Sequence, residues 1–131
     1  VVGDAVHALF NAPDDLEGHV DKALACADDI RALTEEMRHR PLFLEQAFGR
    51  TRIGIETGDA VLGEVGAGGK LDYTAHGDAV NLAARLQDAN KFLGTQICVG
   101  PRAAGEASRT LRAIGRHEIR GFGTMELFTL D

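Results

Sequence analysis

Residues 70–87 read KLDYTAHGDAVNLAARLQ, and in this stretch polar residues recur at spacings that packing alone does not require. Residues 71–75 have the β-favouring centre of a short strand, the letters HGD that follow are typical of a turn, and a helical pattern comes next. Asn81 and Arg85 are four positions apart, so on a helix they project from one side, one turn above the other. An amide beside a permanent, planar cation would suit a polyanionic ligand.

The chain has 131 residues, the size of one domain with a core of its own. It is 44% hydrophobic and 26% charged, which is typical of a soluble globular protein, and it contains no run apolar enough to span a membrane. A net charge of -6 argues against a general nucleic-acid binder but allows a local basic pocket. Cys26 and Cys98 fall in a helical and a strand pattern, so we interpret them as buried, reduced thiols.

The remaining elements follow from hydrophobic periodicity and from the positions of glycine and proline. We expect strands over 1–2 and 5–11, a helix over 16–39, a loop with a short helical turn over 43–48, strands over 51–56 and 60–65, a strand over 71–75, a helix ending near 94, a strand over 95–99, a brief helix from 101 to about 107, and a hairpin formed by 111–120 and 125–130. This order predicts an α+β domain whose sheet is covered by helices on one face.

A glycine-rich run at 63–70 is not a phosphate-binding loop of the Walker A type. That motif needs a glycine six residues before its lysine and a serine or threonine after it, and this chain has Glu64 and Leu71 at those two positions. We interpret the run as a turn between strands.

The letters DYT at 72–74, GDAVNLAARL at 77–86 and GDAVHALF at 3–10 together resemble the catalytic domain of class III adenylyl and guanylyl cyclases, of the bacterial adenylate cyclase type. The resemblance covers essentially the whole chain, with separated motifs in the family's order. It implies one domain over 1–131 with a ferredoxin-like antiparallel sheet and helices on one face. It also implies that the family's first strand and helix, a second metal-binding aspartate and a purine-reading lysine would precede Val1.

The resemblance implies roles for five residues. Asp4 would be a metal ligand, and two Mg²⁺ or Mn²⁺ ions would assist an in-line phosphoryl displacement. Asn81 and Arg85 match the family's transition-state residues, which orient the ribose and neutralise charge on the α-phosphate. Thr74 occupies the position that reads the purine, where threonine points to ATP. Arg120 falls where many relatives have a lysine that holds the terminal phosphates.

Each of these residues also has an ordinary interpretation. Asp4 alone is typical of a turn, and Thr74 is an unremarkable strand residue. Asn81 and Arg85 could form a solvated helix face, and Arg120 could be a surface arginine beside a turn.

The function that the resemblance implies is conversion of ATP to 3',5'-cyclic AMP and pyrophosphate in cyclic-nucleotide signalling. It also implies a cytoplasmic homodimer in which Asp4 of one chain faces Asn81 and Arg85 of the other. Any membrane attachment would come through domains outside this chain, and residues 1–131 alone are expected to have little activity. Two alternatives stay open: a degenerate cyclase-like domain that binds nucleotide or a protein without turnover, and a plain dimerisation module.

Overall fold

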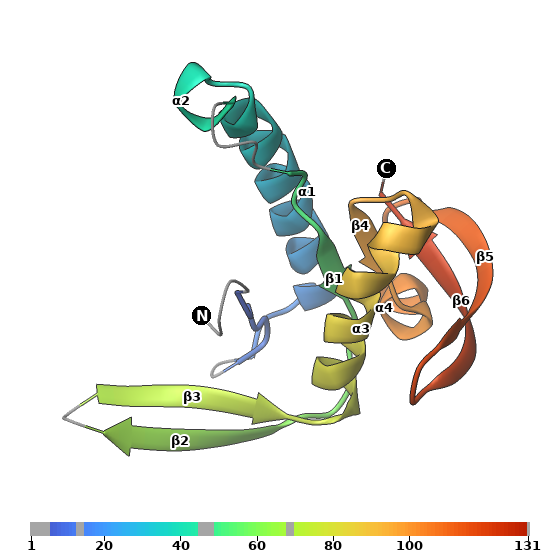
Figure 1. Ribbon diagram of the computed structural model, residues 1–131. Coiled ribbons are helices and arrows are strands. Elements are labelled where there is room, and N and C mark those ends of the chain that lie inside the picture. The colour runs from blue at the N-terminus through green and yellow to red at the C-terminus, as the bar shows by residue number, and fades with distance from the viewer. Residues whose placement is uncertain (1–5, 13–14, 45–48, 68–69, 131) are drawn as a thin grey trace.

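The computed structural model describes residues 6–12, 15–44, 49–67 and 70–130, and for 43–44, 61–67 and 70–76 it describes the backbone alone (Figure 1). The elements are, in chain order, α1 (His19–Arg38), α2 (Pro41–Leu44), β1 (Ile53–Ile55), β2 (Val61–Ala67), β3 (Lys70–His76), α3 (Asp78–Leu93), β4 (Ile97–Val99), α4 (Pro101–Glu106), β5 (Arg112–Ile119) and β6 (Gly123–Thr129). The predicted α+β class is confirmed.

Four strands form one sheet in the order β1-β4-β6-β5. The pairs β4/β6 and β5/β6 are antiparallel, as predicted, whereas β1 and β4 are parallel, with Gly54 opposite Cys98. Parallel neighbours need a crossover connection, and here the crossover contains α3. The sheet is therefore mixed, and its one parallel pair positions α3.

Strands β2 and β3 form a separate antiparallel hairpin in which Thr74 lies opposite Gly63. Figure 1 shows this hairpin extending away from the four-stranded sheet, next to the beginning of α3. The two strands were predicted, but their separation from the main sheet was not.

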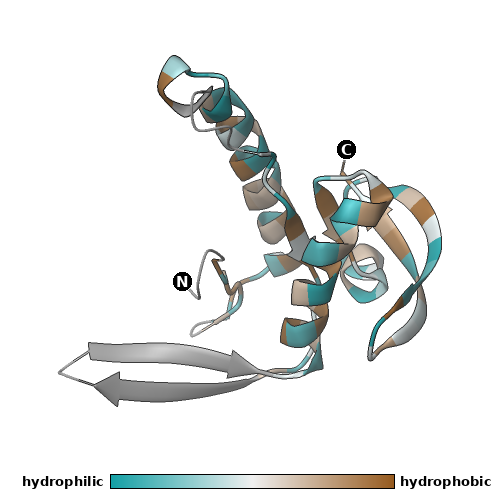
Figure 2. Ribbon diagram, viewed as in Figure 1, coloured by the Kyte–Doolittle hydropathy of each residue, from teal (hydrophilic) through white to brown (hydrophobic). Residues whose placement is uncertain are grey.

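Helix α1 buries Val20, Leu24 and Ala27 against β4, where Ile97 and Val99 belong to the same apolar cluster. Its second half is less covered, since Ile30 is 40% and Leu33 is 57% exposed. Figure 2 shows that apolar (brown) residues continue among hydrophilic (teal) ones toward the end of α1 that meets α2. The predicted long helix is confirmed, although it begins at His19.

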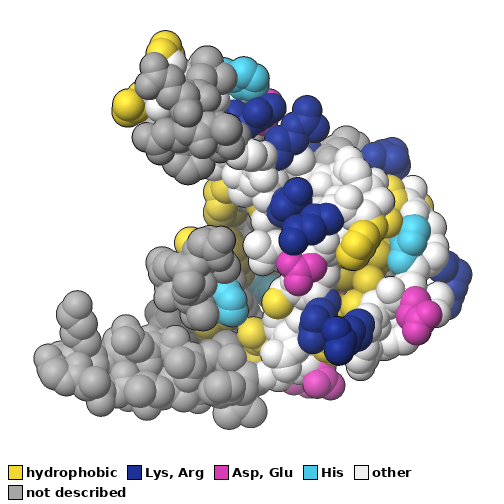
Figure 3. All heavy atoms as spheres, viewed as in Figure 1, with side chains coloured by type: hydrophobic (Ala, Val, Ile, Leu, Met, Phe, Trp, Pro, Cys, Tyr) yellow, Lys and Arg dark blue, Asp and Glu magenta, His cyan; other side chains and the backbone are white. Residues whose placement is uncertain are grey.

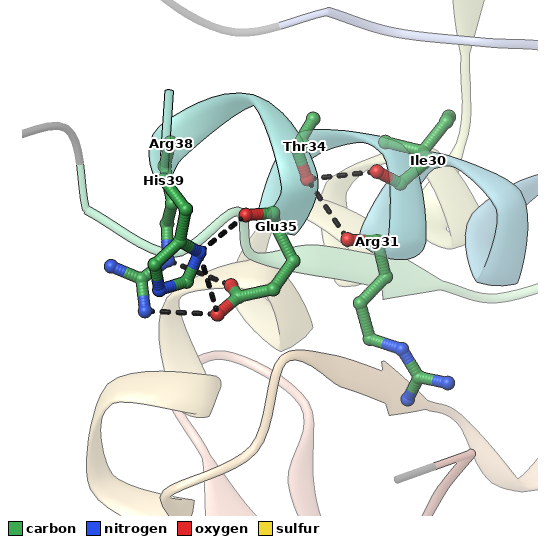
Figure 4. A network of polar contacts seen from close by, with 6 residues as sticks. All are labelled: Ile30, Arg31, Thr34, Glu35, Arg38 and His39. Carbon is green, nitrogen blue, oxygen red and sulfur yellow. Dashed lines mark hydrogen bonds and ion pairs between the residues drawn. The ribbon is translucent and has the colours of Figure 1, made fainter. Parts of the chain in front are cut away.

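The exposed end of α1 is stabilised by local polar contacts, which Figure 4 shows from close by. The guanidinium of Arg38 donates to both carboxylate oxygens of Glu35, at 2.7 and 2.9 Å. The Thr34 hydroxyl donates to the Ile30 carbonyl at 2.7 Å, and His39 Nδ1 lies 2.7 Å from the Glu35 carbonyl oxygen. Contacts between residues three and four apart support a helix where tertiary packing is thin.

Helix α3 packs on the other side of the sheet. It buries Leu82, Leu86 and Ala89 in a cluster that includes Cys98 of β4 and Leu127 of β6. The helix ends at Gly94, whose φ of 69° is the left-handed conformation common at helix C-termini. The bounds of α3 therefore agree with the sequence prediction.

The prediction that helices cover one face of the sheet needs correction. On β4, Ile97 and Val99 contact the α1 cluster, while Cys98 between them contacts the α3 cluster. Successive side chains of a strand point to opposite faces, so α1 and α3 lie on opposite faces. The unbroken burial of β4 is the pattern of a strand covered on both sides.

The strand predicted over residues 5–11 is also wrong for the described residues 6–11, which have no strand conformation. Val6 is 75% exposed, and none of these residues pairs with a strand in the described part of the chain. An extended segment becomes a strand only when a neighbouring strand satisfies its backbone groups. Within the described ranges, no helix combines the length and apolar character that a membrane crossing requires.

Candidate functional site

A shallow pocket of about 390 Å³ lies between α3 and the turn that joins β5 to β6. Its lining residues are Asn81, Ala84, Arg85, Asp88, Arg120, Gly121 and Phe122. Three of the residues singled out from the sequence, Asn81, Arg85 and Arg120, therefore share one pocket. Asn81 and Arg85 come from α3, whereas Arg120 comes from a segment that is distant in the chain.

Helix α3 supplies one wall of the pocket. Asn81, Arg85 and Asp88 are four and three positions apart, which places them on one face of the helix. Leu82 and Leu86, each one residue after a member of this stripe, are on the adjacent face of the helix and are buried against the sheet. Because burial fixes the rotation of the helix, the polar stripe is directed away from the core.

The second wall is the turn after β5. Gly121 and Gly123 have φ values of 87° and 83°, conformations that L side chains rarely adopt. The Phe122 N–H donates to the Ile119 carbonyl at 2.9 Å, which closes the turn. Ile119 itself is buried in the α3 cluster, so Arg120 is held next to α3 by an apolar anchor one residue earlier.

The pocket has the electrostatic character of an anion site that is open to solvent. Asn81, Arg85 and Arg120 are exposed, and their side chains make no hydrogen bond or ion pair with another described residue. Figure 3 shows Lys and Arg side chains over α3 and the β5–β6 hairpin, beside acidic ones. With two arginines and one aspartate, the pocket is locally positive in a chain whose net charge is -6.

Sequence reasoning missed Asp88 and Phe122 as pocket residues. Asp88 could have been found, because it lies three positions after Arg85 on the same helix face. Phe122 could not, since only the packing of its turn against the apolar cluster between α3 and the sheet brings it to α3.

For two other predicted site residues the structure describes no side chain. Asp4 lies outside the described residues. Thr74 lies on β3, where its backbone is paired with Gly63, and its side chain is outside what the structure describes. Their assigned roles in metal binding and purine recognition stay predictions.

A metal centre is not formed by the described residues alone. No three His, Cys, Asp or Glu side chains in the described ranges are grouped so that they could hold a metal ion. The proposed ligand Asp4 is the only metal-binding candidate that the sequence motifs supply within this chain, so metal binding rests on that motif.

The family model of the adenylate and guanylate cyclase catalytic domain matches residues 1–131, the whole chain. The chain belongs to this family. Among curated proteins, adenylate cyclase 1 of Rhizobium meliloti (strain 1021) is 36% identical over 124 residues, which cover 93% of this chain and 19% of the relative. An uncharacterized protein of Mycobacterium tuberculosis (strain ATCC 25618 / H37Rv) is 35% identical over 91% of this chain and 21% of its own length. This chain thus spans about a fifth of the length of these relatives.

Solved cyclase structures have the same fold. A bacterial light-regulated adenylyl cyclase superposes with a TM-score of 0.71 at 25% identity, over 86% of this chain and 33% of that one. The adenylyl cyclase CyaB from P. aeruginosa superposes with a TM-score of 0.72 at 23% identity, over 93% and 65%. The recognition of a class III cyclase domain from the sequence is confirmed.

Proposed function

We propose that this cyclase domain converts ATP to 3',5'-cyclic AMP and pyrophosphate by in-line attack of the ribose 3'-hydroxyl on the α-phosphate. The observation that carries the proposal is the pocket shared by Asn81, Arg85 and Arg120. An amide and two guanidinium groups around one cavity are suited to a triphosphate, because each guanidinium offers several donors and a permanent charge. Adenylate cyclase 1 of Rhizobium meliloti, the 36% identical relative, supports the choice of ATP.

Arg85 contacts the α-phosphate, the group that the 3'-hydroxyl attacks. Negative charge grows on the α-phosphate oxygens and on the bridging oxygen as pyrophosphate leaves, and a preorganised cation stabilises that charge more than it stabilises the substrate. Arg85 is exposed and has no described partner, so no ion pair must break before it binds phosphate.

Asn81 orients the ribose. It lies one helical turn before Arg85, and its amide can donate to one sugar oxygen and accept from a hydroxyl. Holding the 3'-hydroxyl in line with the bond that breaks removes much of the entropic barrier.

Arg120 holds the terminal phosphates from the opposite wall of the pocket. Its planar fork can bind two phosphate oxygens through parallel N–H groups, a geometry that the single ammonium of a lysine does not offer. This contact anchors the leaving group while Arg85 acts on the α-phosphate.

Divalent metal ions, which the cyclase family generally uses, would be held through Asp4. Two Mg²⁺ or Mn²⁺ ions, when bound, would stabilise the attacking and leaving oxygens. Asp4 of one chain would face Asn81 and Arg85 of a second chain, so the active unit would be a homodimer. Thr74 would read the adenine through its hydroxyl.

The test is cyclic AMP formation by the full gene product, with ATP and either Mg²⁺ or Mn²⁺. We expect activity in the parent protein, little in residues 1–131 alone, and a loss of about 100-fold or more in kcat for Asn81→Ala. Lys91→Ala, which changes an exposed residue at the far end of the same helix, is the matched control.

The outcomes separate the competing functions. Product from GTP in place of ATP would change the assigned substrate. Nucleotide binding without product from either would establish a degenerate cyclase-like domain. A protein that neither binds nor converts nucleotide would be an interaction module.

A further inference from the structure

Glu56, the residue directly after β1, joins this strand to the first turn of α4. Its Oε1 accepts hydrogen bonds from the backbone N–H of Ala103 at 2.7 Å and from that of Thr57 at 2.9 Å. Its Oε2 accepts a longer bond of 3.4 Å from the N–H of Arg102. One carboxylate therefore satisfies free N–H groups at the start of a helix and at the end of a strand.

Gly100 makes room for this carboxylate. A Cβ at position 100 would lie 2.1 Å from Oε2 and 2.5 Å from Cδ of Glu56. The Gly100 N–H also donates to the Ile55 carbonyl at 2.8 Å. The end of β1 is therefore joined to the start of α4 by this backbone hydrogen bond as well as by the Glu56 carboxylate. The direction in which the chain leaves β1 is fixed by these bonds.

The segment that leaves β1 then lies against the beginning of α3. A Cβ on Gly58 would be 2.9 Å from the Cβ of Ala79, and a Cβ on Gly77 would be 2.7 Å from the carbonyl oxygen of Asp59. With so little room between them, a displacement of residues 58–59 toward α3 would press on the first turn of that helix.

Asn81 is in that first turn. Its backbone N–H donates to the carbonyl of Gly77 at 3.3 Å, and Gly77 is the residue packed on Asp59. A continuous set of contacts thus runs from the Glu56 carboxylate, through residues 57–59 and Gly77, to Asn81 in the pocket.

We propose that Glu56 is a positioning residue that fixes the first turn of α3, and hence the Asn81 and Arg85 side chains, in the geometry the reaction needs. This inference rests on the proposed function. Glu56 does not line the pocket and touches no reacting atom. Its contribution is to the chemical step, since a small displacement of aligned groups costs turnover more than it costs binding.

The experiment compares Glu56→Ala with Glu56→Gln in the full gene product. The glutamine amide oxygen can take the place of Oε1 and keep both short bonds, whereas alanine removes all three. We expect Glu56→Ala to lower kcat by ~10- to 100-fold with KM for ATP changed less than about threefold. We expect Glu56→Gln to recover kcat to within about threefold of the parent. Equal losses in the two variants, or a loss that only follows the folded fraction in a melting curve, would overturn the proposal.

A second pair of variants covers the case in which Glu56→Ala does not fold. Gly58→Ala leaves the Glu56 bonds in place but puts a methyl group 2.9 Å from the Ala79 Cβ and 3.3 Å from a guanidinium nitrogen of Arg102. Gly105→Ala, in α4, adds a methyl group that meets nothing beyond its own helical turn within 4 Å. We expect the first to lower kcat without a matching change in KM and the second to leave both unchanged. Unaltered kcat in Gly58→Ala would count against the proposal.

A readout that needs no turnover separates this inference from the proposed function. The side-chain amide resonances of Asn81 should shift in Glu56→Ala and return toward the parent positions in Glu56→Gln. If the parent protein forms no cyclic nucleotide, the proposed function fails, and these resonances alone decide the positioning role. Unchanged Asn81 resonances in Glu56→Ala would refute it.

Discussion

Arg85, in the second turn of α3, and Arg120, directly after β5, line the same pocket from opposite walls. Two like charges that face one cavity repel each other, and in the described part of the chain neither has an acidic partner within ion-pair distance. A bound polyphosphate would relieve that repulsion and gain from both cations. The two arginines are therefore suited to bind an anion from solution.

Replacing Arg85 and Arg120 one at a time should affect different kinetic constants. We expect Arg85→Ala to lower kcat by about 100- to 1,000-fold, because its contact strengthens as charge develops on the α-phosphate. We expect Arg120→Ala to act mainly on KM, since the terminal phosphates carry their charge before and after the reaction. Steady-state kinetics of cyclic AMP formation measure both.

Arg116→Ala is the matched control, because Arg116 is an exposed arginine of β5 outside the pocket. If Arg116→Ala raises KM as much as Arg120→Ala does, the loss comes from the change in net charge and not from a contact in the pocket. Equal kcat losses from Arg85→Ala and Arg120→Ala would contradict the assignment of different roles to the two arginines.

Asp88 places a negative charge in the pocket beside Arg85 and Arg120. A carboxylate repels a triphosphate, so we expect Asp88→Asn to lower KM for ATP by about two- to fivefold, with the larger effect at low ionic strength. Asp29→Asn, which changes an exposed aspartate of α1, controls for the change in net charge. A higher KM in Asp88→Asn would mean that the carboxylate orients an arginine, contrary to this prediction.

The sequence predicted best those elements whose ends and apolar periodicity are both visible within one short segment. The bounds of α3 could be predicted because Asp78 stands at its start and Gly94 at its end, with apolar residues at helical spacing between them. The shared face of Asn81 and Arg85 follows from the same periodicity.

Relationships between elements could not be predicted in this way. The polar contacts of Glu56 connect it to Ala103, far along the chain, and no local pattern in the sequence indicates such a bond. The error over residues 6–11 has the same origin, since an alternating segment forms a strand only when a partner strand is beside it. The family resemblance supplied the roles of the site residues, whereas packing of the β5–β6 turn on α3 supplied the pocket.

The contact between Asp21 and Ser108 should make stability depend on pH in the acid range. The Ser108 hydroxyl and N–H both donate to the Asp21 carboxylate, and these hydrogen bonds lower the pKa of Asp21 below its usual 3.8. A lowered pKa in the folded state means that the ionised form stabilises the fold above 3.8 and that this contribution is lost as the pH falls through the folded-state pKa.

We therefore expect Asp21→Asn to lower the denaturant midpoint at neutral pH and to differ little from the parent well below 3.8. Asp29→Asn, which changes an exposed aspartate of the same helix, controls for the change in net charge. Equilibrium unfolding at the two pH values tests this, and a parent–variant difference that grows in acid would have the wrong sign.

Cys98 should be protected from thiol reagents in the folded protein. Its side chain is fully buried, and burial, with a smaller contribution from the negative charge of Glu56, raises the pKa of the thiol to about 12. The thiolate is the reactive species, so both the scarcity of thiolate and the lack of access slow the reaction. In a Cys26→Ser variant, labelling of Cys98 at mildly alkaline pH should be slower in the folded protein than in denaturant by on the order of 1,000-fold.

The same shift predicts alkaline destabilisation. A pKa raised in the folded state leaves stability intact below the unfolded value of 9.0 and reduces it as the pH rises from there toward 12. Cys98→Ala in the Cys26→Ser background removes this titration, so its unfolding midpoint should fall less steeply over that interval. Fast labelling of native Cys26→Ser protein, or identical alkaline slopes with and without Cys98, would contradict a thiol held between α3 and the sheet.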